Sequence, residues 1–401
     1  MSKQIKLSVL SITFVLFMVC LQACAQPTDA DLRAKADVLA HKFIIVDTHQ
    51  DVPERLQGRM EDISVRTERG NFDYPRARQG GLDAVFMAAY VPPRYEERGG
   101  AKTYAENGIN IVKNLANNYP DKFVIAKSPE DVQKQFSGPR ISCVICIENG
   151  SALEGDVNNV KYFYNLGARY ITLCHSMSNI ICDSSFDANR KWHGLSPFGK
   201  QVINEMNRTG MIIDVSHISD EAFYQVIELS KTPVIATHSS CRYFTPGFER
   251  NMSDDMIKML AKKGGVIQIN FGSMFINKDA NLRFNSNRGR GGSSGDPNSR
   301  RGQAGAETNR QSPTVYGDVS EVADHIDHVV KLVGIDYVGF GSDFDGVGDA
   351  LPVGLKDVSA YPNLIYELLK KGYSESDIKK ICSENILRVW SQIQKAGKKI
   401  Y

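Results

Sequence analysis

A chain of 401 residues is long enough for one large α/β barrel or for two ordinary domains. Its 48 basic and 46 acidic residues nearly balance, which argues against a nucleic-acid-binding protein and against a polybasic membrane-surface protein. The hydrophobic content of 42% is ordinary for a globular enzyme with a proper core.

The first 25 residues have the pattern of a secretory signal peptide. Lys3 and Lys6 precede an apolar run from Leu7 to Leu21, and small residues follow it. This run of about 15 residues is short for the roughly 20 that a membrane-spanning helix needs. The four residues that end at Cys24 resemble a bacterial lipobox, which would make Cys24 a lipidated N-terminus, although Gln22 is not the small residue usual there. We expect an exported protein, periplasmic or attached to the outer membrane, and both the lipidated and the free form remain open.

Eight short apolar runs follow along the chain and alternate with helical patterns. The runs cover residues 43–46, 82–91, 141–147, 168–174, 211–215, 234–236, 265–271 and 337–340. Helical periodicity covers residues 28–42, 101–118, 160–166, 197–209, 220–229, 256–262, 319–333, 361–371 and 375–393. Strands that alternate with helices in this way predict a (β/α)8 TIM barrel. An open doubly wound sheet is the alternative, but no Gly-rich phosphate turn follows the first run.

Residues 277–317 interrupt the alternation after the seventh run. Arg, Gly, Ser and Asn dominate this segment, which indicates a long polar insertion between the seventh strand and its helix. We favour a mobile excursion over a lid, although loops after barrel strands ring the active site. Residues 26–401 are then expected to form a single catalytic barrel domain that carries this insertion.

Six of the eight cysteines lie beyond the first 25 residues, too few in a chain of this length for a disulfide scaffold. Cys143 and Cys146 have Cys-x-x-Cys spacing inside the third apolar run. Residues three apart on a strand point to opposite faces, so we expect buried structural thiols.

Side chains suited to metal binding and acid–base chemistry stand where the predicted strands end, the place where a barrel gathers its chemistry. They are His49 and Asp51 after the first strand, Glu148 after the third, His175 after the fourth, His217 after the fifth, His238 after the sixth and Asp343 after the eighth. A lone histidine at a strand end is more often part of the core. Four of the eight histidines at such ends are hard to explain in that way.

Counting ligands suggests a binuclear metal site. One ion could take His49, Asp51 and one oxygen of Glu148, while a second takes His217, His238 and the other oxygen. Three protein ligands per ion leave positions for water, as in catalytic zinc sites. A water shared by two metals becomes a hydroxide nucleophile near neutral pH. This ligand set suits zinc best, with manganese and cobalt as alternatives.

Three further residues could complete the chemistry. Asp343 could position the hydroxide and carry its proton to a leaving amine, or it could merely cap a turn. His175 could donate a hydrogen bond to the oxyanion that forms at an attacked carbonyl. Arg250 offers a guanidinium for bidentate capture of a substrate carboxylate, although Arg242 is nearer to His238 along the chain.

The segments that carry these residues resemble the membrane (renal-type) dipeptidase family, the zinc peptidases of family M19. The matching segments are 47–51, 147–150, 173–176, 213–217, 236–240, 250–251 and 339–346, and they extend over about residues 40–390. The resemblance implies a TIM barrel of the metallo-dependent hydrolase type, two zinc ions per chain and a homodimer. It also implies the following roles: His49 and Asp51 on the first zinc, Glu148 as the bridge, His217 and His238 on the second zinc, His175 and Asp343 at the scissile carbonyl and bridging water, and Arg250 on the substrate's carboxylate.

The resemblance therefore implies an exported binuclear zinc dipeptidase that uses a metal-bridging hydroxide, with a D-residue tolerated at the C-terminal side. Several features depart from the family's pattern: Asn149 follows Glu148 where many members have Gly, the spacing from His238 to Arg250 differs by about a residue, and the 277–317 insertion is longer and more polar than usual. One alternative is a related barrel amidohydrolase acting on cyclic amides, β-lactams or phosphoesters, although no Lys stands at a strand end to bridge its metals. The other is an exported barrel that has lost catalysis, against which the complete ligand set argues.

Overall fold

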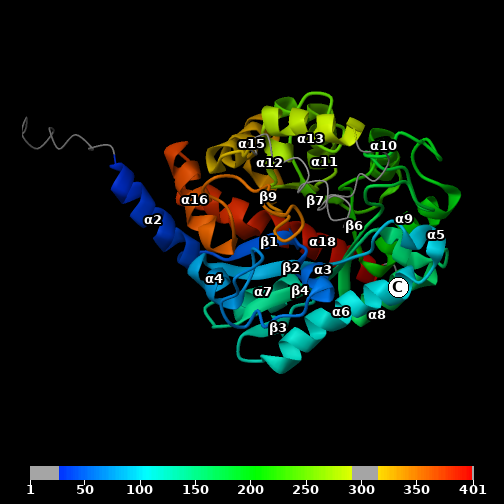
Figure 1. The fold of residues 1–401 in the computed structure, drawn as a ribbon, viewed down its shortest axis with the longest axis horizontal. Coiled ribbons are helices and arrows are strands. Elements are labelled where there is room, and N and C mark those ends of the chain that lie inside the picture. Colours follow the sequence, from blue (N-terminus) through cyan, green and yellow to red (C-terminus); the bar gives the residue numbers. More distant parts are fainter. Residues whose placement is uncertain (1–26, 291–314, 400–401) are drawn as a thin grey trace, which may run out of the picture.

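A computed structural model describes residues 27–290 and 315–399 (Figure 1). The predictions for residues 1–25 and for much of the 277–317 insertion lie outside the described residues. The strands are β1 (Ile45–Gln50), β2 (Leu82–Tyr90), β3 (Phe123–Ile125), β4 (Ile141–Glu148), β5 (Ala168–Thr172), β6 (Ile212–Asp214), β7 (Ile235–Ser239), β8 (Val266–Ile269) and β9 (Val338–Phe340).

The sheet closes into a parallel barrel. Its strand order is β2-β1-β9-β8-β7-β6-β5-β4-β3, and an additional pairing of β2 with β4 joins the two sides into a ring of eight strands. Strand β3 pairs with the first three residues of β4, Ile141–Cys143, and is not part of this ring. All eight predicted strands are present and the TIM-barrel prediction is confirmed, while β3 was not predicted.

Helices surround the barrel (Figure 1). They are α2 (Asp29–Lys42), α3 (Val52–Gly58), α4 (Tyr74–Gln79), α5 (Tyr95–Arg98), α6 (Ala101–Asn118), α7 (Pro129–Gln135), α8 (Asn158–Leu166), α9 (Pro197–Thr209), α10 (Asp220–Leu229), α11 (Asp254–Lys262), α12 (Ser273–Ile276), α13 (Lys278–Arg290), α15 (Val319–Val333), α16 (Tyr361–Lys370), α17 (Glu375–Lys379) and α18 (Asn385–Lys399). Among the described residues, no helix is both long enough and apolar enough to cross a bilayer.

Local sequence signals explain where these helices begin and end. The α9 helix begins after Ser196, whose side chain accepts a hydrogen bond from the Gly199 amide, and Pro197 occupies its first turn. It ends at Gly210, which adopts a φ of 74°, a conformation that costs glycine little. The insertion is less irregular than predicted, because its first described part forms helix α13.

The barrel interior is apolar and is sealed at its base by the last helix. Side chains from seven barrel strands pack with those of α18 in one buried cluster, which includes Val46, Phe86, Tyr170, Trp390 and Ile393. The Phe86 and Trp390 rings lie 5.3 Å apart, and Phe86 stacks on Tyr170 at 6.0 Å. The amino-terminal end of the barrel is therefore closed, which leaves the carboxyl ends of the strands for a site.

Cys143 and Cys146 lie fully buried in β4 as free thiols, which confirms the prediction of buried structural residues. Burial raises the pKa of the Cys143 thiol to about 12, so this thiol stays protonated at neutral pH.

Candidate metal centre and active site

Seven predicted side chains meet at the carboxyl ends of the barrel strands. They are His49 in β1, Asp51 at the start of α3, Glu148 at the end of β4, His175 after β5, His217 after β6, His238 in β7 and Asp343 after β9. Each exposes at most 9% of its surface. The site is therefore a buried cluster of imidazoles and carboxylates.

The Glu148 carboxylate lies between two groups of histidines. Its Oε2 atom is 3.7 Å from His49 Nε2. Its Oε1 atom lies 3.1 Å from His217 Nε2 and 3.3 Å from His238 Nε2. Each carboxylate oxygen thus has its own nearest histidines, as a bridging ligand requires, and the two groups meet where the His49 and His238 rings stack with their centres 3.6 Å apart.

Further donors extend both groups. Asp51 Oδ2 lies 3.4 Å and Asp343 Oδ1 lies 3.9 Å from His49 Nε2. His175 Nε2 lies 3.7 Å from Glu148 Oε1, so this residue stands beside the second group. Ligand atoms within 4.8 Å of one another form three sets: His49, Glu148 and His238; Glu148, His175 and His217; and His49, Asp51 and Asp343.

These donor atoms fit a pair of divalent metal ions. Atoms bound about 2.0–2.2 Å from one tetrahedral ion lie roughly 3.4 Å apart, close to the separations of 3.1–3.7 Å around Glu148. The buried Nε2 of His49 has no hydrogen-bond partner among the described residues, which is costly unless an ion occupies that position. Two buried clusters that share Glu148 are consistent with a binuclear metal site.

Burial sets the protonation of the site. It lowers the pKa of His175 to about 3 and lowers the pKa values of His217 and His238 well below the ordinary value, so the imidazoles are neutral and keep a free lone pair. Burial and the neighbouring Asp51 carboxylate raise the pKa of Asp343 to about 6 and the pKa of Glu148 well above its usual range. Bound cations would relieve this carboxylate crowding.

A buried carboxylate behind the site orients His238. Asp214 Oδ2 accepts hydrogen bonds from the hydroxyls of Thr172 at 2.5 Å and Thr237 at 2.7 Å, and Oδ1 accepts from the backbone amides of Ser216 and Thr237. Thr237 Oγ1 lies 2.9 Å from His238 Nδ1. The imidazole is thus held through Nδ1 with Nε2 directed at Glu148.

His49 is held in the same way. Its Nδ1 lies 2.7 Å from the Tyr170 hydroxyl inside the barrel, and its ring stacks on Tyr170 at 6.3 Å. Nε2 is left to face the carboxylates. Tyr170 therefore belongs to the apolar interior of the barrel and contacts the candidate metal ligand His49.

The two candidate arginines differ clearly in their surroundings. Arg250 is 3% exposed and lies beside His238, where Nη1 donates to Ser239 Oγ and Nη2 donates to the His238 carbonyl, both at 2.8 Å. Arg242 forms a bidentate ion pair with Asp220, with both N–O distances 2.6 Å. The structure thus brings Arg250, and not Arg242, to the histidines.

Backbone conformation at the site is unusual for residues other than glycine. His217 has a φ of 71° and Asp343 a φ of 63°, values in the left-handed region. Such conformations persist where the surrounding structure imposes them, often at functional sites. Both residues belong to the candidate ligand sets described above.

Sequence reasoning did not single out several residues that shape this site. Asn270 Nδ2 donates to Asp343 Oδ2 at 2.7 Å and so orients that carboxylate. Gly346 packs so tightly that a Cβ there would lie 2.2 Å from Asp51 Oδ2 and 2.3 Å from Asp343 Oδ1. Gly346 and Asp214 lie in the segments 339–346 and 213–217 that match the family, which was the available signal for them, whereas no motif marks Asn270.

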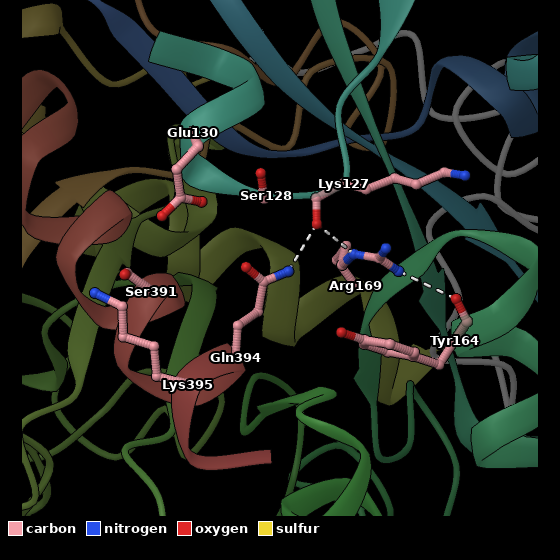
Figure 2. A pocket seen from close by; sticks show the side chains of 8 residues that line it. All are labelled: Lys127, Ser128, Glu130, Tyr164, Arg169, Ser391, Gln394 and Lys395. Atoms are coloured by element: carbon pink, nitrogen blue, oxygen red, sulfur yellow. Dashed lines mark hydrogen bonds between the residues drawn. The ribbon is translucent and has the colours of Figure 1, made fainter. Parts of the chain in front are cut away.

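A cavity of about 320 Å³ lies elsewhere, beside α18 at the base of the barrel (Figure 2). The Arg169 guanidinium donates to the carbonyls of Lys127 and Tyr164, and Gln394 also donates to the Lys127 carbonyl. These contacts tie α8, α18 and the segment after β3 together. The cavity is therefore a junction of the scaffold, remote from the histidines.

Comparisons with known proteins agree with this site. The family model described as membrane dipeptidase (peptidase family M19) matches residues 33–401. Dipeptidase 3 of Mus musculus is 30% identical over 381 residues, which cover 93% of this chain and 69% of the mouse protein. An uncharacterized dipeptidase of Schizosaccharomyces pombe is 30% identical over 382 residues, 91% of this chain and 84% of the yeast protein. The crystal structure of the probable dipeptidase PvdM from Pseudomonas aeruginosa superimposes with a TM-score of 0.80 at 28% identity, covering 91% of this chain and 99% of that chain.

Proposed function

Since the chain belongs to the membrane dipeptidase family, peptidase family M19, and is a metallo-dipeptidase of that family, we propose that it hydrolyses dipeptides with two zinc ions held at Glu148. The observation that carries the proposal is the Glu148 carboxylate, whose Oε2 lies nearest to His49 and whose Oε1 lies nearest to His217 and His238. A single structural ion would not need such a shared ligand.

In this proposal His49 and Asp51 would hold the first zinc, His217 and His238 would hold the second, and Glu148 would be the ligand that they share. When bound, the ions supply Lewis acidity and a water that ionises near neutral pH. Imidazole and carboxylate donors favour zinc over magnesium or calcium. The buried walls exclude bulk water, which strengthens every charge interaction within the site.

The chain's own residues would handle the proton and the oxyanion. Asp343, oriented by Asn270, faces His49 and is placed to accept the proton of the attacking water and pass it to the leaving amine. His175, a neutral imidazole beside Glu148, is placed to donate an N–H to the oxyanion of the attacked carbonyl.

Arg250 would bind the free carboxylate of the dipeptide. Its guanidinium has five N–H donors, only two of which donate to Ser239 and His238, and its buried Nε has no partner among the described residues. We expect Arg250→Ala to raise KM about tenfold to a hundredfold with a smaller change in kcat, because a charge-assisted hydrogen bond to the substrate is lost. Steady-state kinetics on one dipeptide measure this change. An unchanged KM would transfer the role to Arg242.

The decisive experiment is hydrolysis of L-L and L-D dipeptides by the purified protein lacking residues 1–25. The panel is run with zinc, after chelation and with manganese or cobalt restored, and beside the same peptides with an amidated C-terminus. Zinc-dependent cleavage that disappears on amidation supports both the dipeptidase proposal and carboxylate capture, and cleavage of the L-D members supports tolerance of a D-residue. Zinc binding without cleavage of any peptide would refute the proposed substrate, and cyclic amides and β-lactams would then be tested.

We also propose that the protein is exported and acts as a homodimer, on the strength of its N-terminal sequence pattern and its family membership. Fractionation of cells that express the full chain tests export. Metabolic labelling with a palmitate analogue, compared between the wild type and Cys24→Ser, tests lipidation of Cys24. Analytical ultracentrifugation of the purified protein tests the dimer, and a monomer mass at micromolar concentration would contradict it.

A further inference from the structure

Three phenylalanines from separate parts of the chain form one aromatic cluster near the site. Phe186 comes from the segment after β5, Phe248 from the segment after β7, and Phe284 from helix α13 of the insertion. The Phe186 ring lies 5.8 Å from that of Phe248 and 6.3 Å from that of Phe284, and Phe248 and Phe284 are also 6.3 Å apart. We call these three rings the phenyl cluster.

The phenyl cluster lies beside His217 at one end and is joined to Arg250 through Phe275 at the other. The Phe186 ring lies 6.1 Å from that of His217. On the other side, Phe248 contacts Phe275 at 5.9 Å, and the Arg250 guanidinium carbon lies 5.3 Å from the centre of the Phe275 ring. Phe248 is 6% exposed, whereas Phe186 and Phe284 are only half-buried. Phe186, the ring next to His217, and Phe284 are thus the two rings of the cluster that keep part of their surface exposed.

Phe284 is held in place by the first turns of α13. Asn281 donates to the Met274 carbonyl at 2.9 Å, and Asn277 donates to the Glu321 carboxylate at 2.8 Å, which fixes the helix against α12 and α15. Leu282 of the same helix is 55% exposed. The insertion thus contributes one defined aromatic side chain to the cluster.

We propose that the phenyl cluster selects the side chain of the dipeptide's C-terminal residue in favour of apolar and aromatic groups. The proposal rests on the proposed function, because Arg250 holds the carboxylate of that residue. A side chain next to the carboxylate lies within reach of the cluster between Arg250 and His217. Burying an apolar side chain against these rings is favourable, whereas a charged side chain loses hydration without gaining a partner.

The test compares the wild type, Phe284→Ala and the control Leu282→Ala on the dipeptides Ala-Phe, Ala-Ala, Ala-Asp and Phe-Ala. We expect the wild type to prefer Ala-Phe over Ala-Asp. Phe284→Ala should lower kcat/KM for Ala-Phe about tenfold more than for Ala-Ala, the scale of loss when part of an apolar pocket is removed. Leu282→Ala should match the wild type on all four. Phe284→Leu keeps an apolar side chain and should restore most of the preference if the alanine variant folds poorly.

Each other outcome overturns a defined part of this inference. If Phe284→Ala slows all four dipeptides equally while Phe284→Leu does the same, the cluster only supports the fold. If the loss appears on Phe-Ala instead of Ala-Phe, the assignment to the C-terminal residue is wrong. If the wild type cleaves none of the dipeptides with zinc present, the proposed function fails and this inference fails with it. If the wild type and all variants cleave the four dipeptides with the same relative kcat/KM values, the proposed role of the phenyl cluster is refuted while the proposed function stands.

Discussion

The hydroxyl of Thr237 has one proton, which it donates in a hydrogen bond to the Asp214 carboxylate. Asp214 receives four hydrogen bonds, so it acts as an acceptor throughout. The Thr237 oxygen is then left to accept from His238 Nδ1–H, and the lone pair of that imidazole lies on Nε2, facing Glu148. A residue outside the ligand set therefore fixes the tautomer that a metal needs.

Replacement of Thr237 by Val removes this hydroxyl at nearly constant volume. We expect the zinc dissociation constant of the apo protein to rise about tenfold to a hundredfold, the usual cost of losing a partner of a ligating histidine. Competition with a chromophoric chelator measures it. Thr237→Ser keeps the hydroxyl and serves as the control, and equal affinities for the Val and Ser variants would show that the Asp214–Thr237 pair does not act on the metal.

Gly346 is a second residue outside the ligand set that affects the site, because it packs directly against two of the carboxylates. A methyl group there would meet both the Asp51 and the Asp343 carboxylates at 2.2–2.3 Å, so both must move. We expect Gly346→Ala to lower kcat/KM about a hundredfold, since a displacement of about 1 Å at reacting groups costs that much. Gly58 has open space around it, and Gly58→Ala is the matched control. Wild-type kinetics in the Gly346 variant would mean that the carboxylates tolerate the shift.

Residue types at this site were predictable, but their conformations were not. His49, Glu148, His217 and His238 follow apolar runs, and that position alone identified them. The sequence does not predict the left-handed φ of His217, because tertiary contacts impose this conformation. Asn270, Asp214 and Tyr170 were missed for the same reason: their partners are distant in sequence.

At the scale of elements, long periodic segments were predicted well and short irregular ones were not. The predicted ranges 101–118, 220–229 and 319–333 match α6, α10 and α15. Strand β3 has only three residues, and no candidate site residue follows it, whereas His217 and Asp343 follow the equally short β6 and β9. In β1 the register against β2 shifts between Asp47 and Gln50, an irregularity that simple alternation cannot anticipate at the strand that carries His49.

Strand β2 carries a carboxyl group that makes stability depend on pH. Asp83 accepts from the Ile45 amide at 3.0 Å, and burial raises its pKa to about 6. The folded pKa lies above the unfolded value of about 3.9, so the folded state binds the proton more tightly. Its stabilising contribution is complete below about pH 4 and is lost as pH rises through about 6.

We therefore compare the free energy of unfolding of Asp83→Asn with that of the wild type at two pH values. The difference, variant minus wild type, should be about 1 kcal/mol larger at pH 8 than at pH 5. The asparagine oxygen can still accept from the Ile45 amide. Chemical denaturation at the two pH values provides the comparison, with the exposed Asp121→Asn as control. A stability difference that is the same at both pH values would show that Asp83 is already solvated in the folded protein.

At the scale of the whole molecule, the candidate metal ligands come from strands that are far apart in sequence. The proposed ligands run from His49 in β1 to His238 in β7, and the clustered Asp343 follows β9. Ions that bind only the folded barrel add their binding free energy to its stability. We expect chelation to lower Tm by about 5–10 °C and restored zinc to reverse the change. Melting curves that coincide with and without chelator would show that the barrel needs no metal to hold these strands.

The position of α18 also bears on how the protein is made. This helix is the last described element, yet its Trp390 and Ile393 fill the interior that the strands enclose. Every proposed ligand precedes residue 344, so a ribosome that stops after α16 releases a chain with the complete ligand set and an open-ended barrel. The apolar interior at that end stays uncovered until the residues of α18 are present, so this face of the core is the last that the fold can shield from water.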